Sequence, residues 1–167
     1  MIELVIGGAR SGKSRHAEAR AREANLPVIY VATGEARDEE MAARIAHHRD
    51  SRPIHWRTVE EPLALADALR REAASNHCLL VDCLTLWLTN VLLAERDDQI
   101  DKLLATLPTL PGRVILVSNE VGWSIVPENA LARRFRDEQG RLNQRVAAVA
   151  DRVTLVAAGL PLVLKGA

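Results

Sequence analysis

The sequence predicts an α/β fold, a three-layer domain in which helices cover a mostly parallel sheet. Short apolar runs alternate with longer helical stretches along all 167 residues, the pattern of strand–helix–strand units. The runs lack polar alternation, as expected of strands that are buried on both faces of a sheet. The first run leads directly into a glycine-rich segment of the kind that holds phosphate groups. We therefore expect one nucleotide-binding domain over residues 1–167.

Six strands and six helices are predicted in chain order. The apolar runs place the strands at residues 2–6, 28–33, 79–83, 114–118, 153–157 and 161–164. The helical stretches are residues 13–24, 38 to about 51, 61–74, 84–95, 98–107 and 128–150. Pro27, Pro53, Pro108 and Pro111 fall between these elements, because proline disrupts a helix interior. The sequence has no internal repeat and no Gly/Ser-rich linker, so a second domain is not expected.

Composition excludes several classes of protein. The 22 basic side chains of Lys and Arg balance the 22 acidic ones, so the overall field favours neither nucleic acid nor an anionic membrane as partner. Cys78 and Cys83 are too few for a disulfide framework or a four-cysteine zinc site, and we expect buried free thiols. The sequence opens in a strand without a basic leader, and no apolar run approaches the roughly 18 residues of a membrane span. We expect a cytoplasmic protein.

Residues 7–14 match the pattern GxxxxGK[ST] and directly follow a predicted strand. In this pattern successive backbone N–H groups surround phosphate oxygens, and the next helix presents the positive end of its dipole. Lys13 adds a cation, and Ser14 can ligate Mg²⁺. A plain glycine-rich turn is the alternative, but the flanking strand and helix favour the phosphate loop of a P-loop NTPase. The predicted nucleotide contacts are Gly7, Gly8, Ala9, Arg10, Ser11, Gly12, Lys13 and Ser14.

Polar residues follow the other predicted strands as well. Ligands of open α/β sheets bind beyond the carboxyl ends of the strands, so residues 33–34, 82–83 and 119–120 and Gly159 should share one rim with the phosphate loop. Asp82 ends an apolar run, and an acid in that position commonly holds Mg²⁺ directly or through water. The alternative is that Asp82 caps the helix that begins near residue 84.

Two adjacent histidines lie in the predicted helix at residues 38–51. At about 100° per residue, His48 shares a stripe with Met41 and Ile45, whereas His47 points elsewhere. His48 could be a satisfied core histidine, and metal binding is poorly supported because no suitable ligand shares its face. Three arginines surround it in the sequence: Arg44, Arg49 and Arg52. Guanidinium groups would hold phosphate oxygens and favour the neutral imidazole, the form that attacks phosphorus.

Five segments together resemble one enzyme family. They are GGARSGKSRHAE, DEEMAARIAHHRDSRPIHWRTVEEP, VDCLT, SNEVGWSIVPENALARRFRDEQGRLNQRVAAVADRV and LVAAGLPLVLK. Many NTPases share the phosphate loop, but the combination of RIAHHRDSRP and NEVGWSIVPEN is highly specific. Over essentially its whole length the chain resembles the bifunctional adenosylcobinamide kinases and adenosylcobinamide-phosphate guanylyltransferases of cobalamin biosynthesis.

That resemblance implies a RecA-like P-loop domain and two reactions. The first phosphorylates the aminopropanol hydroxyl of adenosylcobinamide with ATP or GTP. In the second, GTP guanylylates an enzyme histidine and pyrophosphate leaves. GMP then passes to adenosylcobinamide phosphate, which gives adenosylcobinamide-GDP. The family also implies a homo-oligomer such as a trimer, with a corrinoid substrate as the small-molecule partner.

The family's motif also assigns roles to individual residues. Its guanylylated histidine precedes a basic residue and lies four positions before the arginine of an Arg-Pro ending, which selects His48 over His47. The resemblance implies that the guanine nucleotide contacts Arg49, Asp50, Ser51, Arg52 and Glu60, and that Ala32 and Thr33 line its pocket. Asp82 would contact the nucleotide or hold Mg²⁺. Glu60 by itself could equally be an acid near the start of the helix that follows Pro62.

Residues 119–127 follow the fourth predicted strand and form a candidate substrate loop. Their glycine and proline exclude an ordinary helix start. Trp123 could pack beneath this loop or stack on a flat ligand. The family usually has glycine where this chain has Ser124, which weakens any claim that the backbone there needs a positive φ.

Two other functions stay open on the sequence. A small-molecule P-loop kinase would use the segment around His48 only as a phosphate clamp, with no covalent intermediate. A nucleotide switch that binds protein partners is disfavoured, because the guanine-reading NKxD pattern is absent and Asp82 is not followed by DxxG spacing.

Overall fold

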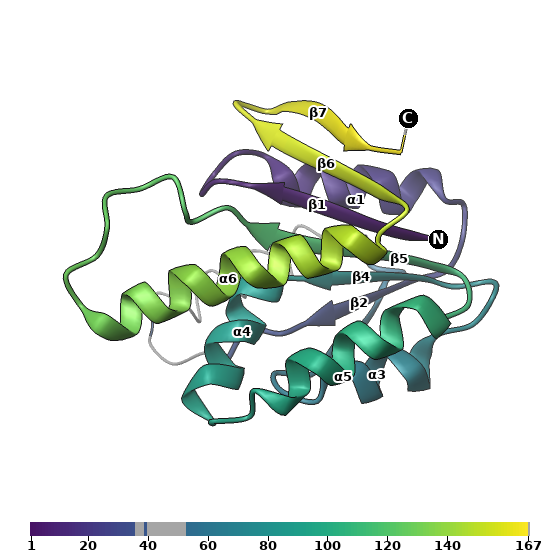
Figure 1. The fold of residues 1–167 in the computed structure, drawn as a ribbon. Helices are drawn as coiled ribbons and strands as arrows, with labels where there is room; N and C mark the ends of the chain where they lie inside the picture. The colour runs from purple at the N-terminus through teal and green to yellow at the C-terminus, as the bar shows by residue number, and fades with distance from the viewer. Residues whose placement is uncertain (36–38, 40–52, 167) are drawn as a thin grey trace.

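The computed structural model describes residues 1–35, 39 and 53–166, which form a seven-stranded sheet between two helical layers (Figure 1). The strands are β1 (Ile2–Gly7), β2 (Val28–Ala32), β3 (Arg57–Glu60), β4 (Cys78–Asp82), β5 (Arg113–Asn119), β6 (Arg152–Ala157) and β7 (Leu160–Lys165). Their order in the sheet is β3-β2-β4-β5-β1-β6-β7. Every pair is parallel except β6 and β7, which form an antiparallel hairpin.

All six predicted strands are present, within two residues of their predicted ends. β3 was not predicted, since its sequence Arg-Thr-Val-Glu has no apolar run. It pairs only with β2 at the edge of the sheet, and three of its four side chains are exposed. An edge strand with little burial carries almost none of the hydrophobic signal by which buried strands are found.

The helices are α1 (Lys13–Glu23), α3 (Leu65–Glu72), α4 (Leu84–Leu93), α5 (Asp98–Thr106) and α6 (Ala130–Val149), with a 3-10 turn at Leu107–Thr109. The predicted helix at residues 38–51 falls almost entirely outside the described residues. α3 begins four residues later than predicted, because Glu61 Oε1 accepts hydrogen bonds from the backbone N–H groups of Leu63 and Ala64 ahead of the helix. Asn129 caps α6 by accepting from the N–H groups of Leu131 and Ala132.

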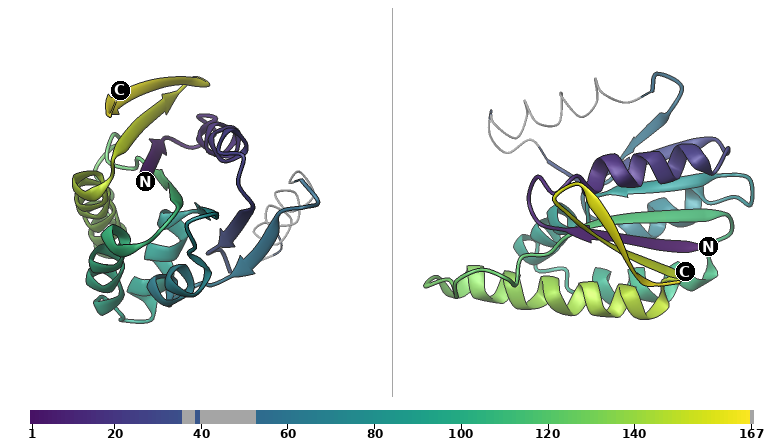
Figure 2. Two further views of the ribbon diagram at one scale, coloured as in Figure 1. Left: turned by 90° about the vertical axis from the view of Figure 1, so that its right-hand side faces the viewer. Right: turned by 90° about the horizontal axis from the view of Figure 1, so that it is seen from above.

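The two faces of the sheet are covered unequally. α1 covers one face, where Ala17 and Ala21 pack against Val5, Leu80 and Ile115 (Figure 2). The other four helices cover the opposite face (Figure 2) and build the larger core, in which Trp87 is the largest fully buried side chain. Trp56 and Trp87 are both buried. Within residues 1–35 and 53–166, no helix has the length and apolar character needed to cross a membrane.

A charge network lies at the amino end of the sheet. The fully buried carboxylate of Glu3 on β1 accepts from Arg20 Nε at 3.0 Å and from Arg113 at 2.9 Å, and Arg152 Nε lies 3.7 Å away. Burial alone would raise the pKa of Glu3. The hydrogen bonds and positive charges of Arg20 and Arg113 outweigh burial, so its pKa falls below the ordinary value. The network ties α1 to three neighbouring strands.

Candidate nucleotide-binding site

The parallel strands carry the predicted polar segments to one rim, at the left of Figure 1. Gly7 at the end of β1 is the register partner of Asn119 on β5 and of Val156 on β6. On the other side of β5, Asp82 ends β4. β5 therefore lies between the strand that enters the phosphate loop and the strand that ends in the acid.

The phosphate loop has a backbone that its glycines make possible. A Cβ on Gly7 would lie 2.4 Å from the Val156 carbonyl oxygen, so no larger residue fits there. Gly12 has φ 94°, a left-handed conformation that favours glycine. The Ser11 carbonyl accepts from the Gly159 N–H at 2.9 Å, which ties the loop to the turn between β6 and β7. Lys13 Nζ donates to the Gly8 carbonyl at 3.2 Å and so lies over the loop.

The residues at the loop suit a nucleotide phosphate. α1 begins at Lys13 with no side-chain cap and no acid in its first turn, so its first N–H groups and positive dipole end face the loop. Ser11 Oγ is buried and has no hydrogen-bond partner in the described part of the chain. A buried hydroxyl without a partner is costly, and a phosphate oxygen would satisfy it. The loop therefore has the donors, the cation and the dipole that a phosphate requires.

Asp82 projects to the face of the sheet that α1 covers. Leu80, two residues earlier on β4, packs on that face with Tyr30, and Asp82 Oδ2 accepts from the Tyr30 hydroxyl at 2.5 Å. The capping alternative for Asp82 is wrong, because Cys83 is the N-cap of α4 and no side chain caps that helix. The positive charge of Lys13 acts on the Cys83 thiol, which shows that the loop lysine and the end of β4 are close.

A Mg²⁺ ion at this place would be held by Ser14 and Asp82. Mg²⁺ beside a phosphate loop takes one hydroxyl and one carboxylate, with phosphate oxygens and waters as its other ligands. Such a site needs no cluster of protein ligands, and none of three or more His, Cys, Asp or Glu side chains occurs among the described residues. Ser14 is the second residue of α1, and α1 covers the face of the sheet to which Asp82 projects.

The two cysteines are buried free thiols, as predicted. Burial, and secondarily the charge of Asp82, raise the pKa of Cys83 to about 11. Burial raises the pKa of Cys78 to about 11 as well. Both thiols are therefore protonated at neutral pH and neither is a nucleophile.

Ala32 and Thr33 differ in what they offer a ligand. Thr33 is fully buried, and its hydroxyl donates to the Cys83 carbonyl at 2.8 Å and accepts from the Cys83 N–H at 3.0 Å. That hydroxyl links the residue after β2 to the residue after β4, so Thr33 stabilises the backbone of the rim and does not face a ligand. Ala32 at the end of β2 is half-buried and is the register partner of both Asp82 and Glu60. Ala32 is thus the member of the pair that can line a pocket.

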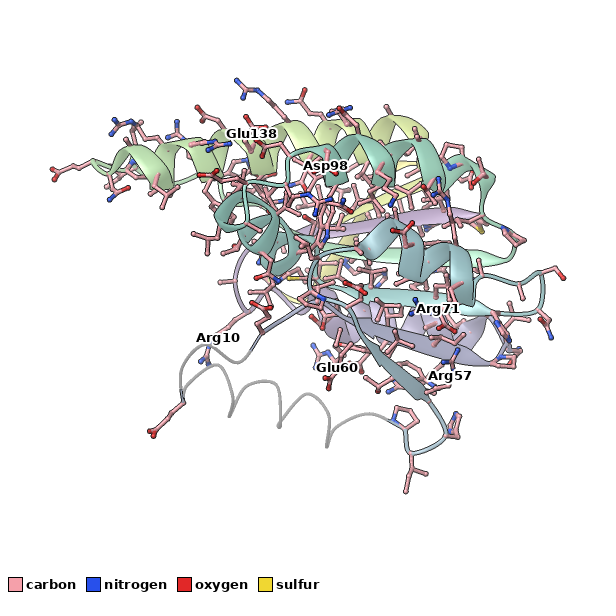
Figure 3. The ribbon with its side chains drawn as sticks, turned by 90° about the horizontal axis from the view of Figure 1, so that it is seen from below. Arg10, Arg57, Glu60, Arg71, Asp98 and Glu138 are labelled. Carbon is pink, nitrogen blue, oxygen red and sulfur yellow. The ribbon has the colours of Figure 1, made fainter. Side chains whose placement is uncertain are left out.

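Glu60 ends β3 and is exposed beside Ala32. The acid that bonds to the backbone ahead of α3 is Glu61, whose Oε1 accepts from the N–H groups of Leu63 and Ala64, and the N-cap residue Ala64 has no side-chain cap. Figure 3 shows Glu60 and Arg10 on one side of the molecule, with Asp98 and Glu138 on the other. A ligand that reaches from the loop past Ala32 would meet Glu60.

Comparison with known proteins identifies the chain. Residues 3–164 match the family described as cobinamide kinase / cobinamide phosphate guanyltransferase. The bifunctional adenosylcobalamin biosynthesis protein CobP of Pseudomonas aeruginosa is 57% identical over 99% of this chain and 98% of its own length. The bifunctional adenosylcobalamin biosynthesis protein CobU of Salmonella typhimurium is 48% identical over 99% of this chain and all of its own length. The chain belongs to this family.

Solved structures support the fold class at low sequence identity. The flagellar accessory protein FlaH of Methanocaldococcus jannaschii has a TM-score of 0.53 at 12% identity, over 99% of this chain and 78% of its own. The RadB recombinase has a TM-score of 0.50 at 17% identity, over 92% of this chain and 73% of its own. The P-loop NTPase fold, RecA-like in its strand order, is confirmed. This chain is an enzyme of the cobinamide kinase and guanylyltransferase family on that fold.

Several residues that the sequence assigned to this enzyme lie outside the described part of the chain. They are His48, Arg49, Asp50, Ser51 and Arg52, together with His47 and Arg44. Trp123 is described, and it is 79% exposed, next to the exposed side chains of Ile125 and Val126. Packing of Trp123 beneath its loop is therefore wrong. Ser124 is not among the described residues with positive φ, in line with the substitution of serine for glycine.

Two residues at the site were not predicted as individual contacts: Tyr30 was given no role, and Asn119 was predicted only as the first residue of a candidate substrate loop. Tyr30 is the single tyrosine of the chain, and its contact with Asp82 depends on strand pairing, which the order of residues does not reveal. Its position two residues before the end of β2 was the available signal. Asn119 was placed on the rim, but its position between Gly7 and Asp82 follows only from the insertion of β5 between β1 and β4.

Proposed function

We propose that this chain phosphorylates adenosylcobinamide with ATP or GTP and then transfers GMP from GTP to adenosylcobinamide phosphate through a guanylyl group on His48. Membership of the family supports two activities, those of a cobinamide kinase and of a cobinamide phosphate guanylyltransferase. The observation that supports the nucleotide chemistry is the rim itself: the phosphate loop with Lys13 lies beside a carboxylate, Asp82, whose orientation Tyr30 fixes. Residues 1–167 would act as one nucleotide-binding domain.

In the kinase step, the loop holds the triphosphate of the donor. The backbone N–H groups of the loop and the first turn of α1 bind phosphate oxygens, and Lys13 adds positive charge. A substrate hydroxyl attacks the γ-phosphorus, the bond from that phosphorus to the bridging oxygen breaks, and a nucleoside diphosphate leaves. Mg²⁺ between Ser14 and Asp82 would neutralise charge on the leaving group. Preorganised positive charge of this kind supplies most of the acceleration in phosphoryl transfer.

In the second reaction, an imidazole nitrogen of His48 attacks the α-phosphorus of GTP. The bond from that phosphorus to the pyrophosphate oxygen breaks, and pyrophosphate leaves. A phosphate oxygen of adenosylcobinamide phosphate then attacks the same phosphorus, and the nitrogen–phosphorus bond breaks. The support for His48 is the sequence RIAHHRDSRP, in which arginines flank the histidine. A covalent intermediate lets two bulky substrates use one pocket in turn.

Labelling with GTP tests the covalent step. Incubation with α-labelled GTP should place an acid-labile and alkali-stable label on the wild-type protein and on His47→Ala, and none on His48→Ala. The His47→Ala variant is the matched control, since it removes the adjacent imidazole and leaves the motif arginines in place. Label that persists in His48→Ala would assign the guanylyl group to another residue. A wild-type protein that phosphorylates adenosylcobinamide but takes up no label would favour the simpler P-loop kinase.

We also propose that the enzyme works in the cytoplasm as a homo-oligomer such as a trimer. The chain has three Trp, one Tyr and one Phe, which is little aromatic surface for a corrin ring within one subunit. The edge strand β7 exposes Leu160, Leu162 and Leu164, an apolar row of the kind that subunit contacts cover. Sedimentation of the active enzyme tests this proposal, and full activity in a monomer would contradict it.

A further inference from the structure

Asn119 lies between the two functional strands of the rim. It is the last residue of β5, the register partner of Gly7 on β1, and two residues beyond the partner of Asp82. Neighbouring strands are about 5 Å apart. Arg113, Ile115 and Val117 face α1, and side chains alternate along a strand, so Asn119 faces α1 as well. Its amide therefore lies on the same side of the sheet as Asp82 and the phosphate loop.

The backbone of Asn119 is held by side chains from both neighbouring helices. Its N–H donates to Thr85 Oγ1 on α4 at 2.8 Å, and its carbonyl accepts from Asn143 Nδ2 on α6 at 3.0 Å. Asn143 Oδ1 is fixed in turn by the hydroxyl of Ser118 at 2.7 Å and by Gln139 Nε2 at 3.0 Å. Ser118 and Gln139 are fully buried. A polar network in this core serves to fix the end of β5, because an apolar core would need no such bonds.

The phosphate loop fixes the next residue. The N–H of Glu120 donates to the Gly7 carbonyl at 3.0 Å, so the chain leaves β5 in contact with the start of the loop. Asn119 is thus held at a constant distance from the loop by α4, α6 and β1. Placement to this precision is what a catalytic group requires.

The amide oxygen of Asn119, in contrast, bonds to nothing in the part of the chain that the structure describes. This atom, Oδ1, is buried. Ser11 Oγ is the other buried atom at this rim without a hydrogen-bond partner in the described residues. It lies 2.5 Å from the place that a Cβ on Gly7 would occupy. Two buried polar atoms without partners therefore lie at this end of the sheet: Ser11 Oγ is next to Gly7, and Asn119 Oδ1 belongs to the residue that pairs with Gly7 on β5. Buried acceptors are almost always paired, so this pair indicates a ligand that approaches Gly7.

We propose that Asn119 is a catalytic residue of the kinase step, in which its Oδ1 accepts a hydrogen bond from the substrate hydroxyl and holds that oxygen in line with the γ-phosphorus. The inference rests on the proposed function. The oxygen–phosphorus bond forms, the bond to the leaving diphosphate breaks, and the hydroxyl proton passes to solvent, because an amide is not a base. Orientation of the attacking oxygen is the whole contribution of Asn119.

The same chemistry predicts which reaction does not need Asn119. In guanylyl transfer the attacking groups are an imidazole nitrogen and then a phosphate oxygen, and at neutral pH the phosphate oxygen carries no proton to donate. The attacking imidazole nitrogen presents a lone pair and not a proton, so the amide oxygen of Asn119 has no hydrogen bond to accept from either attacking atom. Loss of Asn119 should therefore separate the two activities, whereas loss of a general element of the nucleotide site would impair both.

The test compares Asn119→Ala and Asn119→Leu with the wild-type enzyme in three assays. Kinase activity is measured with adenosylcobinamide and GTP, guanylyl transfer with adenosylcobinamide phosphate supplied directly, and nucleotide affinity by equilibrium binding of GTP. We expect the kinase kcat to fall about 100-fold, the value typical of one oriented hydrogen bond at a reacting centre. Guanylyl transfer and GTP affinity should stay within about threefold, as expected of a residue that contacts the attacking hydroxyl alone.

Stability gives an independent readout. Asn119→Leu keeps the number and branching of the side-chain heavy atoms and removes an unpartnered buried acceptor, so its thermal midpoint should equal or exceed that of the wild type. If that variant fails to fold, Asn119→Ala carries the test. A kinase kcat within about threefold of wild type, or an equal fall in both activities, would overturn the role of Asn119. A wild-type enzyme without kinase activity would instead contradict the proposed function.

Discussion

The two ends of the sheet both gather polar and charged side chains but treat them in opposite ways. At the amino end, the buried carboxylate of Glu3 pairs with arginines from α1, β5 and β6. Arg113 Nε and Arg152 Nε lack hydrogen-bond partners in the described residues, but each guanidinium group keeps its ion pair with Glu3. At the carboxyl end, Ser11 Oγ and Asn119 Oδ1 lie buried without partners in the described residues. Charges that the fold satisfies internally stabilise the fold, whereas polar atoms that it leaves unsatisfied indicate where a ligand completes the structure. The comparison thus separates a structural cluster from a functional one.

The largest expected effect is at the carboxyl end. Lys13→Ala removes the cation of the phosphate loop and should lower both the kinase and the guanylyltransferase rate by about 10²–10³-fold, since each reaction needs charge stabilisation on the leaving group. The thermal midpoint should change little, because Lys13 bonds to the exposed rim of its own loop. Steady-state assays of the two reactions, with circular dichroism melting, measure the three quantities. A variant that unfolds early would place Lys13 among the structural charges.

The amino end should show the reverse pattern. Glu3→Gln leaves the guanidinium charges of Arg20 and Arg113 without their carboxylate, and we expect a loss of about 2–3 kcal/mol in the free energy of unfolding. This figure is below the usual cost of breaking a buried pair because the arginines are partly exposed. Activity per folded molecule should be unchanged. Urea titration gives the free energy, and Asp98→Asn, which breaks the exposed Arg96–Asp98 pair, is the control with little expected effect.

The pH dependence of stability follows from the same carboxylate. The pKa of Glu3 is lowered in the folded protein, so its contribution is present above the unfolded value of 4.5 and is lost as pH falls through the folded value. The wild type should therefore lose more stability than Glu3→Gln between about pH 5 and pH 3. Parallel curves for the two proteins would show that Glu3 does not act through its charge.

The smallest effect tests how the carboxyl end is supported. Tyr30→Phe removes the hydroxyl that orients Asp82, and we expect the Mg²⁺ concentration for half-maximal kinase activity to rise about tenfold, as for other groups that orient a metal ligand. The rate at saturating Mg²⁺ should recover most of the wild-type value. A lowered rate that no Mg²⁺ concentration restores would mean that Tyr30 acts on something other than the carboxylate.

The sequence predicted the buried framework of the fold well, because strands covered on both faces are nearly continuous apolar runs. β1, β2, β4, β5 and β6 follow this rule. It could not predict β3, whose residues are mostly exposed at the sheet edge, nor the late start of α3, which depends on the side chain of Glu61. Local hydrophobicity carries no information about an edge strand or about a carboxylate that bonds to the backbone ahead of a helix.

At the site, residues within one motif were easier to predict than residues brought together by topology. The phosphate loop is a single segment, and Asp82 follows a recognisable apolar run, so both were assigned correctly to the rim. Asn119 was also assigned to the rim, but its neighbours there, and the contact of Tyr30 with Asp82, depend on the order β2-β4-β5-β1. That order is set by the packing of the whole domain and not by any local pattern.

The central claim is that one phosphate loop at the carboxyl end serves both reactions, and parallel incubation with GTP labelled at the α- or the γ-phosphate tests it most directly. The wild-type enzyme should transfer the γ-label to added adenosylcobinamide, and in the absence of a corrinoid it should retain the α-label on the protein. Lys13→Ala should abolish both transfers together. Loss of one label with full retention of the other would show that the two reactions use separate nucleotide sites.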